Sequence, residues 1–143
     1  MKKIAINYIF NQTLGRQNHV RVIRLSAPKA IYNFSNKEDI LNGLNEKDYQ
    51  RYCSQFMNEL GDVLEESPSQ RISDVQISDG VIKVTTQGEK TFVINRQVPN
   101  RQIWYSSPVS GPQRFNWDLQ EAKWKNQKNE ELSKLLFKEI DQI

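Results

Sequence analysis

The pattern of apolar and polar residues predicts a long amphipathic helix near the middle of the chain. Apolar residues recur at gaps of three and four from Tyr49 to Leu64, which places them on one face of an α-helix. They are Tyr49, Tyr52, Cys53, Phe56, Leu60, Val63 and Leu64. We expect Asn45 to cap this helix, with Asp48 as an acidic partner in the first turn, and residues 67–69 (Ser-Pro-Ser) to end it.

Short alternating segments after this helix predict an antiparallel sheet. The expected strands lie around 75–77 and at 81–86, 91–95, 102–107 and 113–117, with a short sixth at 123–125. Tight turn signals such as Asp79-Gly80 separate them, so that neighbouring strands pair antiparallel.

A second amphipathic helix is predicted near the end of the sequence, with Asn129 as its cap. Its apolar stripe consists of Leu132, Leu135, Leu136, Phe137 and Ile140. Two such helices bury their apolar faces best side by side on the sheet. The sequence therefore predicts an α+β fold: a two-layer α/β sandwich with two helices packed on one face of a five- to six-stranded antiparallel sheet.

Charge divides the chain into two parts. The formal net charge is +3, but seven of the 20 basic residues precede the first acidic residue, Glu38. The 13 remaining basic residues stand against 17 acidic ones, which gives −4 from that point onward. We therefore predict a basic leader at 1–37 and a domain at 38–143. The leader has the composition of a mitochondrial transit peptide. A disordered basic tail and a secretory signal are the alternatives, although Asn7 interrupts the apolar run that secretion requires.

Histidine and cysteine are too scarce for several kinds of site. His19 is the only histidine and Cys53 the only cysteine, so no intramolecular disulfide and no cysteine-rich zinc site can form. Removal of the leader would leave no imidazole, which excludes Cys–His and Ser–His nucleophilic pairs within the chain. A metal site must then use oxygen ligands, which favours hard cations and weak binding. Cys53 lies on the apolar helix face, where we expect a buried thiol.

Acidic residues form a stripe beside the apolar face of the first helix. Asp48, Gln55, Glu59, Asp62 and Glu66 fall within an arc of roughly 60°. Asp62 and Glu66 are like-charged neighbours at i,i+4, which repel each other, and a bound cation would relieve that repulsion. An ordinary solvated face is the alternative interpretation.

The segment from Val93 to Trp117 reads VINRQVPNRQIWYSSPVSGPQRFNW. It resembles the signature of the frataxin family, in which Ile-Asn-Lys-Gln is followed by Pro-Asn-Lys-Gln-Ile-Trp, Ser-Ser-Pro, Ser-Gly-Pro and an aromatic pair ending in Trp. A weaker resemblance runs from about Asn45 to the C-terminus. The resemblance implies an iron-binding accessory protein and regulator of iron–sulfur cluster assembly, located in the mitochondrion or a related organelle.

The same resemblance implies the partners and the chemistry. The expected partners are a cysteine desulfurase and an iron–sulfur scaffold protein, with sulfur transfer as the promoted step. Neither nucleic-acid binding nor membrane insertion is expected. Ferrous iron would bind weakly, and a monomer is expected, with an iron-dependent oligomer as the alternative. A ferroxidase activity is attributed to the family, but the sequence shows no organised redox site, so an enzymatic role stays open.

Two sets of site residues follow. In the fourth strand, Ile103 is expected to face the helices and Trp104 the solvent. The resemblance assigns partner docking to Asn95, Asn100, Gln102, Trp104 and Arg114. It assigns iron binding to Glu59, Asp62, Glu65, Glu66, Asp74 and Asp79. The chain departs from the family by carrying Gln50, Ser54, Gln55 and Asn58 where relatives carry more acids, which implies weaker iron binding.

A rival interpretation is a sheet-face module that binds nucleic acid or protein without a metal. Outward aromatic residues near Arg96, Arg101 and Arg114 suggest it. The net charge of −4 on the domain opposes nucleic acid, because phosphate contacts need a cationic surface.

Overall fold

The structure is a computed structural model that describes residues 8–9, 22–23, 44–66 and 69–143. Its contacts divide the chain into two units, Met1–Asn33 and Phe34–Ile143. In the first unit, β1 (Tyr8–Ile9) pairs antiparallel with β2 (Val22–Ile23). The predicted transit peptide and its alternatives otherwise fall outside the described residues.

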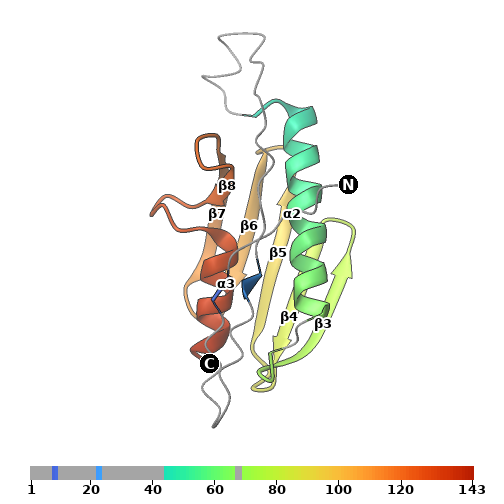
Figure 1. Cartoon of the computed structure of the whole chain (residues 1–143), viewed down its shortest axis with the longest axis vertical. Coiled ribbons are helices and arrows are strands. Elements are labelled where there is room, and N and C mark those ends of the chain that lie inside the picture. Colours follow the sequence, from blue (N-terminus) through green and yellow to red (C-terminus); the bar gives the residue numbers. More distant parts are fainter. Residues whose placement is uncertain (1–7, 10–21, 24–43, 67–68) are drawn as a thin grey trace. The chain divides into compact units, whose positions relative to one another are not determined.

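The second unit is a two-layer sandwich of two helices and one sheet. Its elements are α2 (Glu46–Glu66), β3 (Ile72–Ser78), β4 (Val81–Thr86), β5 (Thr91–Gln97), β6 (Gln102–Ser107), β7 (Gly111–Asp118), β8 (Lys123–Lys125) and α3 (Leu132–Asp141). The six strands are antiparallel and follow one another in chain order. Figure 1 shows α2 and α3 side by side on the same face of this sheet. The predicted architecture is confirmed, and the sheet has six strands rather than five. Neither described helix is long and apolar enough to cross a membrane.

The cap predicted for α2 is present. The side-chain oxygen of Asn45 accepts a hydrogen bond of 2.8 Å from the backbone N–H of Asp48, and its amide nitrogen donates one of 2.9 Å to the Asp48 carboxylate. These bonds satisfy a backbone donor that the first helical turn leaves without a partner. They explain why the helix begins at this point of the sequence.

The buried face of α2 is shifted from the predicted one. Met57 and Gly61 are buried, whereas Phe56 and Val63 are only half-buried. Gly61 lies close to Ile77 of β3: a Cβ at this position would come within 2.8 Å of the Ile77 Cδ1 atom. Since Gly61 has no side chain, the helix can approach the sheet edge there. This flank of α2 therefore faces the sheet.

The cap predicted for α3 is wrong. Asn129 has a φ of 63° and its side-chain oxygen accepts a hydrogen bond of 3.0 Å from Lys125. An isolated antiparallel bridge pairs Lys125 with Glu131, and Glu131 has extended backbone angles. This bridge delays the start of the helix until Leu132.

Strict alternation along the strands builds the core. The helix-facing positions that are fully buried include Ile82, Val84, Phe92, Ile94, Ile103, Tyr105 and Phe115. On α3, the residues Leu132, Leu135, Leu136 and Ile140 are buried against them. The period of two in the strands and the period near 3.6 in the helices therefore meet in one apolar layer.

Four aromatic rings link α2 to the β7–β8 end of the sheet. Tyr52 stacks on Trp117 with 4.6 Å between ring centroids, Trp117 meets Trp124 at 5.4 Å, and Trp124 meets Tyr49 edge-on at 5.9 Å. Trp117 thus faces the helices. The indole nitrogens of both tryptophans are buried and have no hydrogen-bond partner among the described residues. The two tryptophans therefore stabilise this cluster through packing, whereas the Tyr49 hydroxyl also donates a hydrogen bond of 2.8 Å to the Gln102 carbonyl.

A buried acid connects α3 to β6. Glu139 is 3 % exposed, and its Oε2 atom accepts hydrogen bonds from the Tyr105 hydroxyl at 2.6 Å and the Ser107 hydroxyl at 2.5 Å. The Ser107 oxygen in turn accepts the backbone N–H groups of Val109 and Ser110, at 2.9 and 3.2 Å. Burial, and then the bond and charge of Glu139, raise the pKa of Tyr105, so its hydroxyl keeps the proton that it donates.

Replacing Tyr105 with phenylalanine is expected to cost about 1–3 kcal/mol of unfolding free energy. The ring stays, but the buried carboxylate of Glu139 loses one of its two hydroxyl donors, and an undersatisfied buried acceptor is costly. Urea denaturation measures the change as a lower midpoint with the same slope. Ser106→Ala, at the exposed neighbour, is the control and should stay within about 0.5 kcal/mol of wild type. Equal midpoints for the two variants would show that the network adds no stability.

Candidate functional site

The sheet face opposite the helices carries a row of the predicted docking residues. In the sheet register, Asn95 of β5 lies opposite Trp104 of β6, and Trp104 lies opposite Arg114 of β7. Residues that face each other in adjacent strands share one side of the sheet. Because Ile103 and Tyr105 are buried under the helices, this row lies on the uncovered side, as alternation predicted.

Two contacts hold the Trp104 ring in place, and a third orients one of its partners. The Arg114 guanidinium lies over the ring, 5.0 Å from its centroid. The indole N–H of Trp104 donates a hydrogen bond of 3.0 Å to the side-chain oxygen of Gln102, whose amide group donates one of 3.0 Å to the side-chain oxygen of Asn116. The ring is half-buried and fixed before any partner arrives, which lowers the entropy cost of binding. Asn116 was missed by the sequence reasoning, although it lies two residues after Arg114 and so on the same face.

Asn100 lies at the border of this face. It is exposed in the turn between β5 and β6, where the Arg101 backbone N–H donates to the Val98 carbonyl at 3.1 Å. Arg101 has a φ of 52°, and its guanidinium donates to the Leu44 carbonyl at 2.7 Å. The turn is thus tied to the start of α2. The structure brings four of the five predicted docking residues onto one face, with Asn100 beside them.

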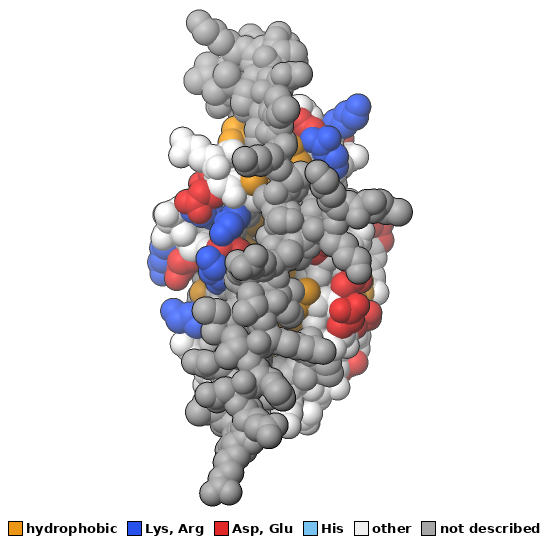
Figure 2. All heavy atoms as spheres, in the orientation of Figure 1, with side chains coloured by type: hydrophobic (Ala, Val, Ile, Leu, Met, Phe, Trp, Pro, Cys, Tyr) orange, Lys and Arg blue, Asp and Glu red, His pale blue; other side chains and the backbone are white. Residues whose placement is uncertain are grey.

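The four predicted iron ligands on α2 lie along its last two turns. Successive helical residues are about 100° apart, so Glu59 and Glu66 fall on the flank of Tyr52, which stacks on Trp117 of β7. Glu65 falls on the opposite flank, near Gly61, and Asp62 lies between the two flanks, pointing away from the sheet. Figure 2 shows acidic side chains on the α2 side of the molecule.

The two remaining predicted ligands belong to strand β3 and to the turn that follows it. By alternation Asp74 of β3 is on the open face of the sheet, where it accepts a hydrogen bond of 2.8 Å from Gln76. Asp79, in the turn after β3, forms an ion pair of 3.0 Å with Arg96. Within the described part of the chain, no three acidic, cysteine or histidine side chains come together as a metal-binding group. The six-residue iron set therefore stays a prediction.

The fold changes the titration of Glu59 on this helix. Partial burial raises its pKa, the nearby charge of Asp62 raises it further, and a hydrogen bond of 3.0 Å from Gln55 offsets part of the shift. A carboxylate that the fold makes harder to ionise gains from a neighbouring cation.

Replacing Glu59 with glutamine is expected to raise the unfolding free energy at pH 7 by about a few tenths of a kcal/mol. An acid whose folded pKa is raised adds stability below its unfolded pKa, near 4.3, and loses it as the pH rises through the folded value. The variant and wild type should thus be equally stable near pH 4 and diverge above it. Glu89→Gln, which removes an exposed charge from a turn, corrects for net charge. A variant less stable than wild type at pH 7 would contradict this interpretation.

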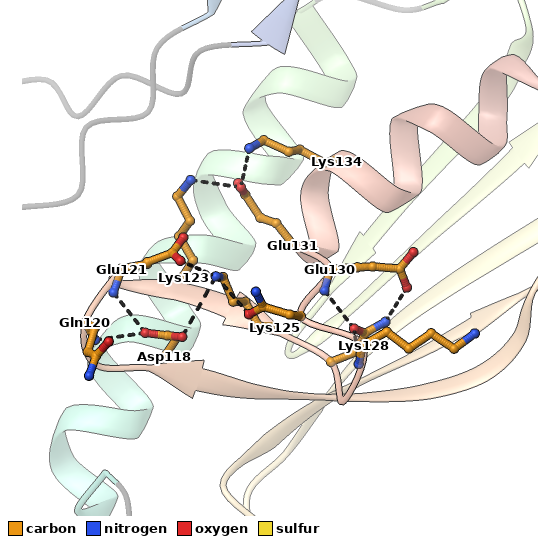
Figure 3. A network of polar contacts seen from close by, with 11 residues as sticks. Asp118, Gln120, Glu121, Lys123, Lys125, Lys128, Glu130, Glu131 and Lys134 are labelled. Carbon is orange, nitrogen blue, oxygen red and sulfur yellow. Dashed lines mark hydrogen bonds and ion pairs between the residues drawn. The ribbon is translucent and has the colours of Figure 1, made fainter.

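A second polar cluster joins β7 and β8 to α3 (Figure 3). The Lys125 side chain is 8 % exposed, and its amine lies 2.5 Å from a Glu121 oxygen and 3.9 Å from an Asp118 oxygen. Nearby, Lys123 and Lys134 contact one oxygen of Glu131 at 2.9 and 3.0 Å. Burial by itself would raise the pKa of Glu131, but the hydrogen bonds and charges of the two lysines outweigh it and lower the pKa. Asp118, Glu121 and Glu131 each have a lysine partner, so we assign the cluster a structural role.

Cys53 is buried, as predicted, and has no part in either candidate site. Burial raises the pKa of its thiol to about 11. A thiol with such a pKa is almost fully protonated at neutral pH and is a poor nucleophile and metal ligand.

Comparisons with known proteins point to one protein family. The family model described as frataxin-like domain matches residues 42–143. Frataxin from Dictyostelium discoideum, named as mitochondrial, is 41% identical over 83 residues, covering 57% of this chain and 43% of the relative. The mitochondrial frataxin homolog of Saccharomyces cerevisiae is 37% identical over 108 residues, covering 73% and 60%. The chain thus spans about half the length of the relatives that it matches.

Solved structures give the same picture of the fold. A frataxin from Psychromonas ingrahamii superposes with a TM-score of 0.55 at 20% identity, covering 66% of this chain and 90% of the other, which supports the fold alone. The trimeric frataxin of Saccharomyces cerevisiae with its full-length N-terminus has a TM-score of 0.50 at 30% identity, covering 81% and 97%.

Proposed function

Since the chain belongs to the frataxin family, we propose that it is an iron-binding accessory protein and regulator of mitochondrial iron–sulfur cluster assembly. In this role it docks on a cysteine desulfurase–scaffold complex and promotes sulfur transfer. The similar proteins of several organisms are named as mitochondrial, which supports the same location for this chain.

The observation that carries the proposal is the ordered Trp104 on the uncovered sheet face. Its ring lies under Arg114 and is hydrogen-bonded to Gln102. An aromatic ring that is already fixed buries a large area on binding and loses little conformational entropy, which is typical of residues that dominate interfaces. Amide and guanidinium groups surround it, and these can pair with polar groups of a partner protein.

Ferrous iron is proposed to bind along the stripe of Glu59, Asp62 and Glu66 on α2, with Glu65, Asp74 and Asp79 as more distant contributors. Carboxylate oxygens suit a hard, exchangeable cation. Spread along a helix, they favour loose binding over a closed site with fixed geometry. This supports an iron-handling role rather than a dedicated ferroxidase centre.

The test is a desulfurase assay with the purified scaffold protein, run with and without this chain. We expect the chain to raise the rate of sulfide production, and the Asp62→Asn/Glu66→Gln double variant to dock normally but bind ferrous iron more weakly in calorimetry. Should the chain neither bind the complex nor change the rate, the proposed function is wrong. Unchanged iron binding in the double variant would remove only the assigned iron site. An oligonucleotide titration at several salt concentrations tests the rival nucleic-acid interpretation.

A further inference from the structure

Strand β3 leaves one edge of the sheet open among the residues that the structure describes. It pairs with β4 and with no other described strand. At the opposite edge, the bridge between Lys125 and Glu131 extends the pairing beyond β8. An open edge carries N–H and C=O groups without partners, which can pair with a strand of another chain.

The register shows which backbone groups of β3 point outward. Two residues join β3 to β4, and Ser78 lies opposite Val81, so these two form the hydrogen-bonded pair next to the turn. The direction of bonding alternates along a strand. Gln76 therefore also bonds to β4, whereas the backbone N–H and C=O groups of Val75 and Ile77 point away from the sheet.

The side chains of this edge allow contact with another strand. Ile77 is 47% exposed, so a strand that pairs with this edge can bury part of its side chain. The strand contains no lysine and no proline, the residues that most often protect an edge. A β-bulge lies between Ile72 and Asp74, which leaves the segment from Asp74 to Ser78 regular.

This segment is complementary to itself in the antiparallel direction. If two copies pair with their Gln76 residues opposite each other, Val75 of one lies opposite Ile77 of the other, and Asp74 lies opposite Ser78. The apolar pairs meet, the acid meets a hydroxyl, and no like charges face each other. The Val75–Ile77 pairs are also those whose backbone groups point outward. Each can exchange two hydrogen bonds, about four in all.

We propose that β3 is a self-association edge through which two copies of this chain form a symmetric dimer with one continuous sheet. A two-fold contact of this kind uses the same edge from both copies and stops at two. The contact involves one short strand per copy, so the dimer is weak and transient. This inference is independent of the proposed function, because it uses neither iron nor a partner protein.

Sedimentation velocity of the full chain without metal tests the dimer, with samples of up to about 1 mM, where small interfaces associate. Salt near 0.15 M screens the repulsion between the two Glu65 residues, which the dimer would bring near each other. Ser78→Asp sets two like-charged pairs against Asp74 and should raise the dissociation constant about tenfold. Ser78→Lys should lower it, and adding Asp74→Lys to Ser78→Asp should restore association. Ser106→Asp, an equal charge change on β6, is the control and should leave the constant unchanged.

Amide hydrogen exchange provides a second readout on the same samples. The amides of Val75 and Ile77 should gain protection as concentration rises, while the amide of Gln76, bonded to β4, stays protected throughout. A monomer at every concentration, a trimer, or equal constants for Ser78→Asp and Ser78→Lys would overturn the proposal. So would protection of Val75 and Ile77 that does not depend on concentration, since another segment of the same chain would then cover the edge.

Discussion

Replacing Trp104 with alanine is expected to weaken binding to the desulfurase–scaffold complex at least about thirtyfold, with little loss of stability. A central aromatic anchor contributes about 2 kcal/mol or more to an interface. On the folding side, the half-buried ring loses mainly its contact with Arg114, worth about 1 kcal/mol or less. A fully buried Trp→Ala change costs about 3–5 kcal/mol instead. The measurements are the affinity for the complex and the melting temperature.

Two control variants accompany this experiment. Ser106→Ala lies on the same strand and the same face, is exposed, and should change neither quantity. Trp117→Ala should destabilise the fold, because that ring stacks on Tyr52. The docking assignment is wrong if Trp104→Ala melts as badly as Trp117→Ala, or if it binds the complex as tightly as wild type.

Replacing Trp124 with alanine is expected to cost about 3–5 kcal/mol of unfolding free energy and to lower the melting temperature by more than about 10 °C. The ring is 2% exposed and packs against Tyr49 and Trp117. Its removal leaves a cavity between α2 and β8. The loss comes from packing, since the indole nitrogen has no hydrogen-bond partner in the described part of the chain.

Trp124→Phe separates packing from hydrogen bonding. It retains an aromatic ring and removes the N–H group, so it should lose less than half as much stability as Trp124→Ala. If the phenylalanine variant were as unstable as the alanine variant, the indole N–H would have a role that packing does not explain. Calorimetry and urea denaturation of both variants give the comparison.

Much of the fold could be predicted because the strands alternate without exception in the middle of the sheet. Ile82, Val84, Phe92 and Ile94 face the core at every second position. In β6 the same alternation turns Ile103 and Tyr105 toward the core, which is enough to place Trp104 on the opposite face. The docking face followed from that alternation. Its hydrogen bonds did not, because the sequence does not say which residues of neighbouring strands lie opposite each other.

Other features depend on contacts between segments that are far apart in the sequence, and local sequence patterns do not reveal such contacts. Glu139 is an acid on a buried helix face, and its partners Tyr105 and Ser107 lie more than thirty positions away. Gly61 is buried because Ile77 lies beside it, and no periodic pattern in the sequence indicates this contact. Asn129 had the sequence of a cap, but the pairing of Lys125 with Glu131 overrode that preference.

The position of α3 in the chain has a consequence for biosynthesis. Its Glu139 satisfies the hydroxyls of β6, and its leucines cover the apolar face of the sheet, yet it is synthesised after every strand. While the nascent chain is still shorter than about 132 residues, the inner face of the central strands has no complete cover, which exposes it to aggregation and makes it a substrate for chaperones. The domain should therefore fold only after α3 has left the ribosome.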